Sequence, residues 1–269
     1  MIIYKSINKL KKEVNFKANI GFVPTMGALH KGHLSLIESS KKKCQKTLVS
    51  IFVNPSQFNR KADYKKYPKN LSKDIKILKK TKIDYVFIPN KKDIFRSRNK
   101  MKIKINKKDK ILCAKFRIGH FEGVLGVINQ LLKAVKAKYM FLGEKDYQQV
   151  YLIKNFIKNK FDTKIVKCQT VRHKNSLPYS SRNFLLRKDY LLKASKISSK
   201  IKNFNYQIKK NLKNINKLEK VKKDIAKAGV DIEYLEIRNK NNLTKNINKK
   251  NFKIFIAYYI NKVRLIDNF

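Results

Sequence analysis

The stretch GFVPTMGALHKGHLSLI, residues 21–37, carries the features from which the fold can be predicted. A mostly apolar run over residues 18–23 is closed by Pro24, which is typical of a buried parallel strand. From His33 onward, apolar residues precede a polar, lysine-rich run that ends at Lys43, and this pattern predicts a helix. A helix N-terminus presents backbone N–H groups and the positive end of a dipole. The junction is therefore a natural phosphate site.

Two glycines in this junction indicate which phosphate chemistry it serves. Gly27 and Gly32 let a phosphate approach the backbone closely, because neither has a Cβ. Their spacing is that of a Walker A loop, but His33 and Leu34 stand where Lys and Ser/Thr hold the γ-phosphate and Mg²⁺. The Walker interpretation therefore fails. The sequence HKGH at residues 30–33 resembles instead the HxGH signature of adenylate-transferring enzymes, in which the histidines face the phosphates.

Two simpler interpretations of the histidine pair stay open at this point. In the first interpretation, the loop is a structural turn and its histidines are incidental. In the second the histidines bind zinc, although no cysteine or further histidine lies nearby at ligand spacing.

The charge of the chain would ordinarily indicate a nucleic-acid-binding protein. The 269 residues carry a formal net charge of +48 and the sequence pI is 10.2. The lysines are nevertheless spread along almost the whole chain, together with abundant Asn and Ile, instead of forming one arm or stripe. We interpret this as a general shift in amino-acid usage. No specific nucleic acid is expected as a partner, only weak polyanion binding at low salt.

Cysteine usage and hydropathy predict the compartment. Cys44, Cys113 and Cys168 are odd in number, widely spaced and outside any CxxC motif, as in a reduced cytosolic protein. No apolar segment of membrane-spanning length and no signal peptide is recognised, so a soluble, cytoplasmic protein is expected.

Strand and helix patterns alternate through the first two thirds of the chain. After the first strand and helix, the patterns predict strands at 47–53, 83–88, 139–142 and 163–168, and helices at 71–80, 121–136 and 146–158, the last N-capped by Asp146. This alternation predicts an α/β fold, a Rossmann-like doubly wound parallel sheet. Because ligands bind beyond the carboxyl ends of such strands, the loops at 30–33 and 54–58 are expected to line one crevice.

The pattern changes after residue 183. Lysine-rich helices at 188–203 and 207–228 precede strands at 232–237 and 252–260, which predicts a separate, smaller α+β domain. The expected division is residues 1–176 for the Rossmann-like domain and 177–269 for the C-terminal domain. The basic stretch 91–110, with an alternating strand at Met101, Ile103 and Ile105, is assigned no role.

Seven blocks along the chain resemble one family. They are PTMGALHKGH, VSIFVNPSQF, DYKKYP, IGHFEGV, GEKDYQQ, SSRN and the terminal RLIDN, in the family's order. On these blocks, essentially the whole chain resembles pantothenate synthetase (pantoate–β-alanine ligase). The resemblance implies a carbon–nitrogen ligase of pantothenate and coenzyme A biosynthesis. ATP, used with Mg²⁺, would activate (R)-pantoate to pantoyl adenylate with release of pyrophosphate, and β-alanine would then give pantothenate and AMP.

The resemblance also implies how the parts of the protein are used. Residues 1–176 would bind the nucleotide and pantoate, and residues 177–269 would form a lid. The protein would be a homodimer.

The resemblance assigns roles to individual residues. His33 is implied as proton donor, with His30, Lys145 and Arg182 as further catalytic groups around the pyrophosphate. Gln57 is implied to bind pantoate and β-alanine, and Gln149 to bind pantoate. The implied ATP-binding residues are Met26, Gly27, Ala28, Leu29, His30, Lys31, Gly32, His33, Gly143, Glu144, Lys145, Asp146, Val171, Tyr179, Ser180, Ser181 and Arg182. No tightly bound cofactor and no dedicated protein metal ligand is expected.

Two loops depart from the family's pattern. RIGHF at residues 117–121 replaces an RPGHF-like block but keeps its Arg, Gly and His. NSLPY at residues 175–179 replaces the usual DGLAM/L, so a glycine is lost, Pro178 is gained and Tyr179 is bulkier than the usual aliphatic residue. We expect a stiffer loop and an altered adenine pocket.

Three rival functions remain. A different HxGH nucleotidylyltransferase would transfer AMP to a phosphorylated acceptor, and would need Arg or Lys where Gln57 and Gln149 stand. A basic RNA-binding protein would carry RRM- or OB-like aromatic motifs, and none is recognised. A degenerate, weakly active synthetase is the third.

Overall fold

The chain forms two compact units, which are described separately. The structure is a computed structural model that describes residues 1–59, 61–95 and 103–269. The first unit comprises Met1–Asn106 and Arg117–Thr170, and the second comprises Lys107–Phe116 and Val171–Phe269. By contacts, residues 171–176 and the inserted segment Lys107–Phe116 therefore group with the C-terminal part of the chain. The functional division at residue 176 stays a prediction.

A six-stranded parallel sheet forms the centre of the first unit. Its order is β1-β4-β3-β2-β5-β6, and every recorded pairing is parallel. The strand order reverses between β2 and β5, so the carboxyl ends of these two strands flank the switch point at which such sheets bind ligands. The bounds are β1 (Ile2–Tyr4), β2 (Ile20–Thr25), β3 (Lys46–Ile51), β4 (Tyr85–Phe87), β5 (Tyr139–Gly143) and β6 (Lys164–Cys168).

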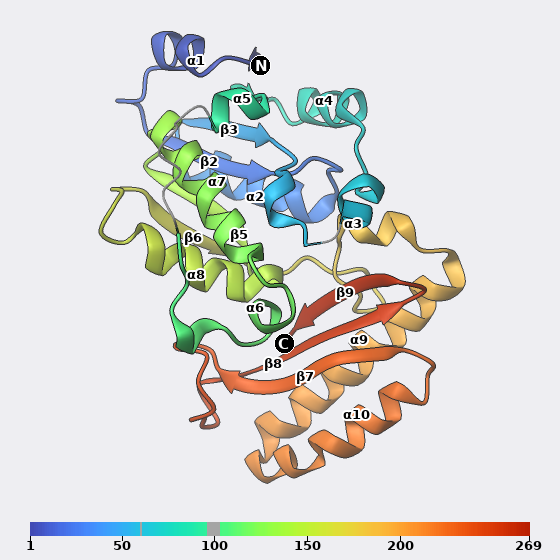
Figure 1. Cartoon of the computed structure of the whole chain (residues 1–269). Coiled ribbons are helices and arrows are strands. Elements are labelled where there is room, and N and C mark those ends of the chain that lie inside the picture. The colour runs from blue at the N-terminus through green and yellow to red at the C-terminus, as the bar shows by residue number, and fades with distance from the viewer. Residues whose placement is uncertain (60, 96–102) are drawn as a thin grey trace. The chain divides into compact units, whose positions relative to one another are not determined.

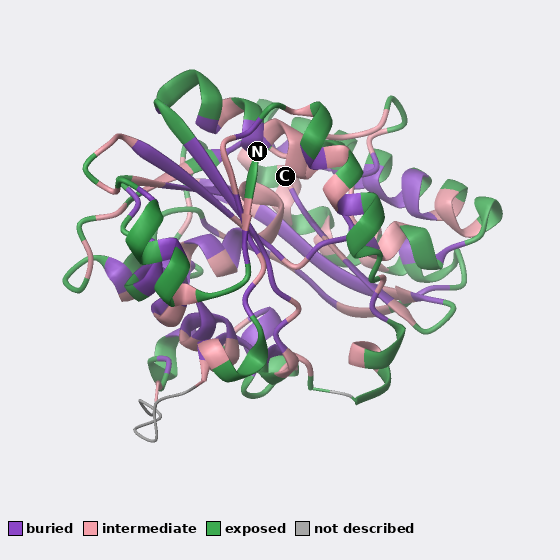
Figure 2. Cartoon of the chain, turned by 90° about the horizontal axis from the view of Figure 1, so that it is seen from above, coloured by how far each residue is buried: buried purple, intermediate pink, exposed green. Residues whose placement is uncertain are grey.

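Helices cover both faces of this sheet. In Figure 1, α2 lies behind the sheet, where it packs against β2, β3, β5 and β6, and α7 with α8 lies in front. Figure 2 shows the strands mostly buried and the outer helix faces exposed. The doubly wound α/β prediction is thus confirmed. The helices are α1 (Ile7–Glu13), α2 (Lys31–Lys43), α3 (Lys61–Lys66), α4 (Leu71–Lys80), α5 (Lys91–Ile94), α7 (His120–Ala134) and α8 (Tyr147–Ile157).

The structure corrects the predicted boundaries at both ends of the 26–30 loop. Pro24 does not close β2, because the strand continues to Thr25. The Thr25 carbonyl accepts from Phe52 on the β3 side, so Pro24 faces the other side, where pairing with β5 has already ended at Phe22. No ladder hydrogen bond is lost there. Helix α2 begins at Lys31, two residues earlier than predicted, with His30 as its N-cap.

A three-stranded antiparallel sheet forms the second unit, confirming the smaller α+β fold. Its order is β7-β8-β9, and its core is an apolar cluster shared with the helices that follow Leu186. The elements are α6 (Cys113–Phe116), α9 (Lys188–Lys210), α10 (Leu218–Ala226), β7 (Asp231–Asn239), β8 (Phe252–Ile260) and β9 (Val263–Asn268), with 3-10 turns at Lys107–Asp109, Ser181–Leu185 and Leu212–Lys217.

Two further predictions differ from the structure, and two strands of the structure had no counterpart among the predictions. The two helices predicted at 188–203 and 207–228 are instead one long helix, α9, followed by a 3-10 turn and the short α10. Strands β1 and β9 were not predicted. Of the strand predicted over Met101–Ile105, residues 101 and 102 lie outside the described residues, and residues 103–106 form no strand.

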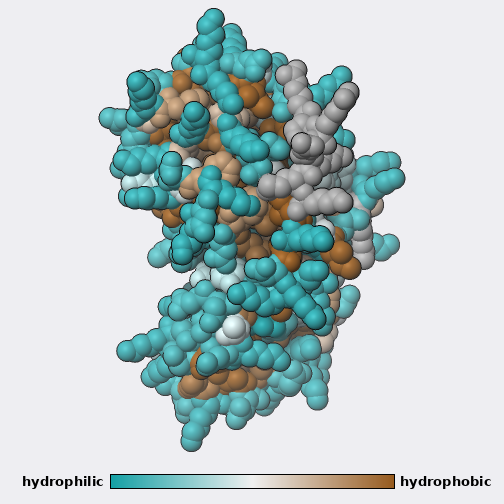
Figure 3. Space-filling model, turned by 60° about the vertical axis from the view of Figure 1, so that its left-hand side comes forward, coloured by the Kyte–Doolittle hydropathy of each residue, from teal (hydrophilic) through white to brown (hydrophobic). Residues whose placement is uncertain are grey.

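Hydrophilic side chains are distributed widely over the surface. On the face shown in Figure 3, teal residues are spread over both units, with smaller brown patches interspersed. This agrees with lysines that are distributed along the sequence. In the described parts of the chain, no helix combines the length and hydropathy needed to cross a membrane.

Candidate active site

The buried carboxylate of Asp74 holds the loop after β2 in place. Asp74 in α4 is 3 % exposed. Its Oδ2 accepts the backbone N–H of Ala28 at 2.9 Å and its Oδ1 accepts that of Leu29 at 2.8 Å. Gly27 has φ +77°, and a Cβ there would lie 2.7 Å from Asp74 Oδ2. The glycine is thus required both by the backbone conformation and by the close carboxylate.

Two histidines cap the first turn of α2 reciprocally. The Nδ1 atom of His30 accepts the backbone N–H of Gly32 at 3.1 Å, and the Nδ1 atom of His33 accepts that of His30 at 3.4 Å. This is a capping box in which imidazoles replace the usual hydroxyl and carboxylate. Since each Nδ1 is an acceptor, each neutral ring carries its proton on Nε2. The ring centroids are 4.1 Å apart.

Both imidazoles are held in the neutral form. Burial lowers the pKa of His30 to about 3, helped by repulsion from a protonated His33 and from the positive charge of Lys145, and opposed by Asp146. Burial also lowers the pKa of His33 to about 4, and Lys145 contributes in the same direction. The site therefore combines two neutral N–H donors with one ammonium group.

The loop after β5 brings Lys145 to these histidines. Gly143 ends β5, and Glu144–Asp146 form a 3-10 turn before α8. Lys145 Nζ lies 3.5 Å from Asp146 Oδ1, and Lys145 acts electrostatically on both imidazoles. Asp146 occupies the N-cap position predicted for it, but its side chain makes no capping hydrogen bond. The two predicted ATP loops are thus brought together at the β2/β5 switch point.

Gln57 is fixed within the first unit on several sides. It is 7 % exposed and belongs to the 3-10 turn Pro55–Gln57 after β3. Its side chain contacts Asn54 Nδ2 at 3.3 Å and the sulfur of Met26. A Cβ on Gly123 of α7 would lie 2.4 Å from the Ser56 carbonyl oxygen, so the helix approaches this turn as closely as a backbone allows.

The RIGHF block, which departs from the family's pattern, also supports Gln57. The Nδ1 atom of His120 lies 2.6 Å from the Gln57 carbonyl oxygen, and Arg117 Nη2 donates to the same oxygen at 3.3 Å. Arg117 Nη1 lies 2.9 Å from His120 Nε2. Because Nε2 must accept from the guanidinium, Nδ1 carries the ring proton and donates it to the carbonyl. The block therefore keeps its Arg and His in defined contacts although its proline is lost.

Gln149 lies in the first turn of α8. Its neighbours Tyr147 and Gln148 are buried, whereas Gln149 is half-buried. Gln149 and Lys145 both follow the carboxyl end of β5.

In the second unit, the predicted nucleotide-binding residues lie on one hairpin and the turn after it. Tyr179 N donates to the Val171 carbonyl oxygen at 3.1 Å, which joins the two arms. Ser180 N-caps the following 3-10 turn by accepting the Arg182 backbone N–H at 3.3 Å. The Arg182 guanidinium donates to the carbonyl oxygen of Arg264 in β9 at 3.2 Å.

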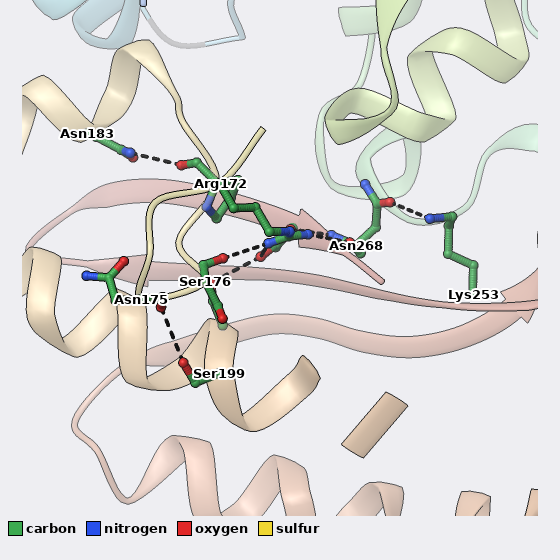
Figure 4. A network of polar contacts seen from close by, with 10 residues as sticks. Arg172, Asn175, Ser176, Asn183, Ser199, Lys253 and Asn268 are labelled. Atoms are coloured by element: carbon green, nitrogen blue, oxygen red, sulfur yellow. Dashed lines mark hydrogen bonds and ion pairs between the residues drawn. The ribbon is translucent and has the colours of Figure 1, made fainter. Parts of the chain in front are cut away.

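This hairpin is tied to the C-terminus by Arg172, as Figure 4 shows. The guanidinium makes two 2.8 Å hydrogen bonds to Asp267 and donates to the carbonyl oxygens of Ser176 and Asn268, each at 2.9 Å. Asp267 is 4 % exposed and also accepts from Ser198 in α9 at 3.1 Å. Such a bidentate, largely buried pair fixes orientation more firmly than a surface ion pair does.

We can now compare the chain with known families, since the loop at residues 26–33, Lys145 and the buried Gln57 have been described. A model of the family described as Pantoate-beta-alanine ligase matches residues 2–269. The chain belongs to the pantoate-beta-alanine ligase family.

Relatives and solved structures agree with this assignment. A pantothenate synthetase from Francisella tularensis subsp. novicida (strain U112) is 42 % identical over 267 residues, covering 98 % of this chain and 94 % of that protein. A crystal structure of the Francisella tularensis ligase, complexed with beta-gamma ATP and beta-alanine, has a TM-score of 0.85 at 40 % identity and covers 100 % and 97 % of the two chains. A pantothenate synthetase from Thermus thermophilus has a TM-score of 0.92 at 26 % identity, with 100 % and 99 % covered.

The family defines the reaction. The protein is an ATP-dependent ligase that joins pantoate to β-alanine through a pantoyl adenylate, forming pantothenate and releasing AMP and pyrophosphate. The resemblance described from the seven blocks is thereby confirmed.

Sequence reasoning missed several residues that shape the site. Asp74 carried one usable signal: it lies four residues before Leu78, so an acid shares the buried face of a short amphipathic helix. Such an acid needs a buried partner. Asp267 lies in the RLIDN block, but nothing in the sequence pairs it with Arg172, because 95 residues separate them.

Proposed function

We propose that His30, His33 and Lys145 bind the polyphosphate of ATP and stabilise the charge that develops on pyrophosphate as pantoate attacks the α-phosphate. The observation that carries this proposal is the reciprocal cap, which places the proton of both neutral rings on Nε2. Two preorganised N–H donors and one ammonium group suit a leaving group whose negative charge grows. They also need no rearrangement when the charge appears.

The backbone of the loop contributes less to phosphate binding than the sequence predicts. The N–H groups of Ala28 and Leu29 are used by Asp74, and that of Gly32 is used by His30. We therefore assign the phosphate contacts mainly to side chains. The anionic phosphates would raise the pKa of both imidazoles, which allows His33 to act as proton donor once ATP is bound.

The amide of Gln57, with that of Gln149, is proposed to bind pantoate. A neutral amide donates to a carboxylate and accepts from a hydroxyl, and it adds no charge that competes with the phosphates. Gln57 is also assigned to β-alanine. Its support from Asn54 and His120 keeps its position defined during the second half-reaction.

The remaining assignments concern the second unit and the assembly. Ser180, Ser181 and Arg182 are proposed to bind the nucleotide phosphates, Val171 and Tyr179 the adenine, and residues 177–269 to act as a lid. Mg²⁺ is proposed to enter as MgATP, with phosphates supplying most of its ligands; the described residues contain no group of three or more His, Cys, Asp or Glu arranged for a metal. We further propose a cytoplasmic homodimer, tested by fractionation and by analytical ultracentrifugation.

The decisive experiment separates the two half-reactions. Pyrophosphate–ATP exchange that requires pantoate but not β-alanine reports adenylate formation, and pantothenate formation reports the second step. His30→Ala, His33→Ala and Lys145→Ala should each reduce exchange by about a hundredfold or more. The matched control is Lys158→Ala, an exposed lysine just after α8, which should exchange at the wild-type rate. Wild-type exchange in any one of the three would remove that residue from the mechanism.

A further inference from the structure

The hairpin at residues 171–179 carries a stacked pair of rings. Arg172 and Pro178 form an antiparallel bridge, and His173 N donates to the Leu177 carbonyl oxygen at 2.8 Å. Across the hairpin, the His173 and Tyr179 ring centroids are 3.7 Å apart with 28° between the ring planes. Tyr179 immediately precedes Ser180, so the pair adjoins the turn assigned to the phosphates.

The hairpin that carries the rings is rigidly supported. Its turn includes Ser176 at φ +70°, whose carbonyl oxygen accepts from Arg172. Asn183 donates to the Pro178 carbonyl oxygen at 3.0 Å, and Ser199 to that of Asn175 at 3.3 Å. Figure 4 shows these contacts around one short loop. A flat side chain on such a loop loses little conformational entropy when it binds a ligand.

We infer that Tyr179, backed by His173, is a two-ring platform on which the heterocyclic base of the nucleotide stacks. The inference rests on the proposed function, which places the base near Val171 and Tyr179. It adds that His173 is a positioning residue, because its ring covers one face of Tyr179 and fixes the ring plane. Aromatic rings stack on bases in offset geometries, and any base can do so because every base has a π-face.

A tryptophan placed at position 179 tests the stack directly. The chain has no Trp, so Tyr179→Trp gives a protein with one indole fluorophore. ATP should quench its emission saturably, and inorganic tripolyphosphate, which lacks a base, should not. The control is Tyr206→Trp, at a position in α9 that is 56 % exposed and outside the hairpin, where ATP should cause no quenching. Absence of quenching in a Tyr179→Trp protein that still turns over would overturn the inference.

Kinetics test the role of His173. Tyr179→Leu should raise the KM for ATP about tenfold with little change in kcat, the size expected for one lost base–aromatic stack. His173→Ala should raise KM by a smaller factor, about threefold, and His173→Phe should restore most of that loss. Unchanged KM in Tyr179→Leu, or no rescue by Phe, contradicts the platform. These variants decide the matter if Tyr179→Trp itself is inactive.

The two levels of proposal fail in different ways. Wild-type protein without pantoate-dependent pyrophosphate release would refute the proposed site, whatever the fluorescence shows. Normal turnover with an unchanged KM in Tyr179→Leu would refute only the stacked platform.

Discussion

Asp74 and Leu29 are 45 residues apart in sequence, yet the buried carboxylate of one accepts the backbone N–H of the other at 2.8 Å. Together with the bond to Ala28, this contact fixes the loop that ends in the histidine cap. The loop conformation is therefore set by α4 as well as by the glycines within the loop.

Replacing Asp74 tests this dependence. Asp74→Asn removes one of two carboxylate acceptors, and Asp74→Ala removes both, so the N–H groups of Ala28 and Leu29 lose the hydrogen bonds that the carboxylate accepts. We expect the free energy of unfolding to fall by about 1–3 kcal/mol and turnover to fall about tenfold or more. Urea unfolding and pyrophosphate release measure the two effects. Asp162→Asn, at an exposed position in the same unit, is the control; equal behaviour of Asp74→Asn and Asp162→Asn would contradict the prediction.

Two glycines of α7 form an internally matched pair. A Cβ at Gly123 would lie 2.4 Å from the Ser56 carbonyl oxygen, whereas one at Gly126 meets nothing within 4 Å. Gly126→Ala should stabilise the protein by about 0.5–1 kcal/mol, because alanine loses less backbone entropy in a helix. Gly123→Ala should destabilise it by more than about 1 kcal/mol and raise the KM for pantoate, since the turn with Gln57 must move. Thermal unfolding and steady-state kinetics would show whether the two changes have opposite signs.

The buried histidines predict a specific acid sensitivity. The folded-state pKa values of His30 and His33, about 3 and 4, lie below the ordinary value of 6.5. Between these limits the unfolded chain binds more protons than the folded chain, so this stabilising contribution is present above pH 6.5 and is lost as the pH falls. At pH 5 we expect a loss of about 1–2 kcal/mol per histidine. Urea midpoints at pH 7 and pH 5 should differ less in His30→Gln/His33→Gln than in wild type, and an equal difference would refute the assignment.

The tie between Arg172 and Asp267 predicts a nucleotide-specific effect. Arg172→Lys keeps the charge but cannot make the two parallel hydrogen bonds or reach both carbonyl oxygens. We expect the KM for ATP to rise about fivefold or more through loosening of the hairpin, at the scale of about 1 kcal/mol, while the KM for β-alanine stays the same. Arg187→Lys, in the exposed ion pair with Asp189, should leave both values unchanged. A parallel rise in both KM values would indicate general damage to the fold.

The charge of the chain predicts salt-dependent stability. With a formal net charge of +48, like charges repel in the compact state and salt screens them. Raising NaCl from about 0.02 to about 0.3 M should stabilise the protein by about 1–2 kcal/mol, which corresponds to roughly 3–6 °C in Tm. Sucrose at equal osmolality controls for non-ionic effects. A Tm that falls with NaCl would show that attractive pairs dominate.

Local patterns predicted the elements that carry their own signal. Helix α4 and strand β8 have the predicted bounds, because one has a clear helical stripe and the other a long β-branched and aromatic run. Strand β1 has three residues and no periodicity to detect. Over helix α9 the sequence pattern predicts two helices, with a break between residues 203 and 207. In the structure, Ile197, Ile201 and Phe204 continue one buried stripe through that point.

The candidate site shows the same difference between features that carry a local sequence signal and features that do not. The HxGH loop could be predicted to follow a strand and open a helix, because residue type and spacing encode it locally. The roles of Gln57 and Gln149 come from the family resemblance and stay predictions. The contacts that hold the loops of the site in place could not be predicted, since Asp74 and Asp267 act on residues 45 to 95 positions away. Those partners are defined only once the chain has folded.

The inserted segment Lys107–Phe116 has a consequence for synthesis on the ribosome. Cys113 lies 3.0 Å from Tyr234 Oη and accepts from Arg264, and Arg264 is in turn paired with Glu233. The partners of this segment are thus made more than a hundred residues after it emerges. The first unit can complete its sheet before Tyr234 and Arg264 are synthesised. Until translation is almost finished, the segment of the nascent chain therefore lacks the residues that it contacts in the folded protein. A fragment that begins at Val171 would lack this piece of its own interior, and would be a poor candidate for folding alone.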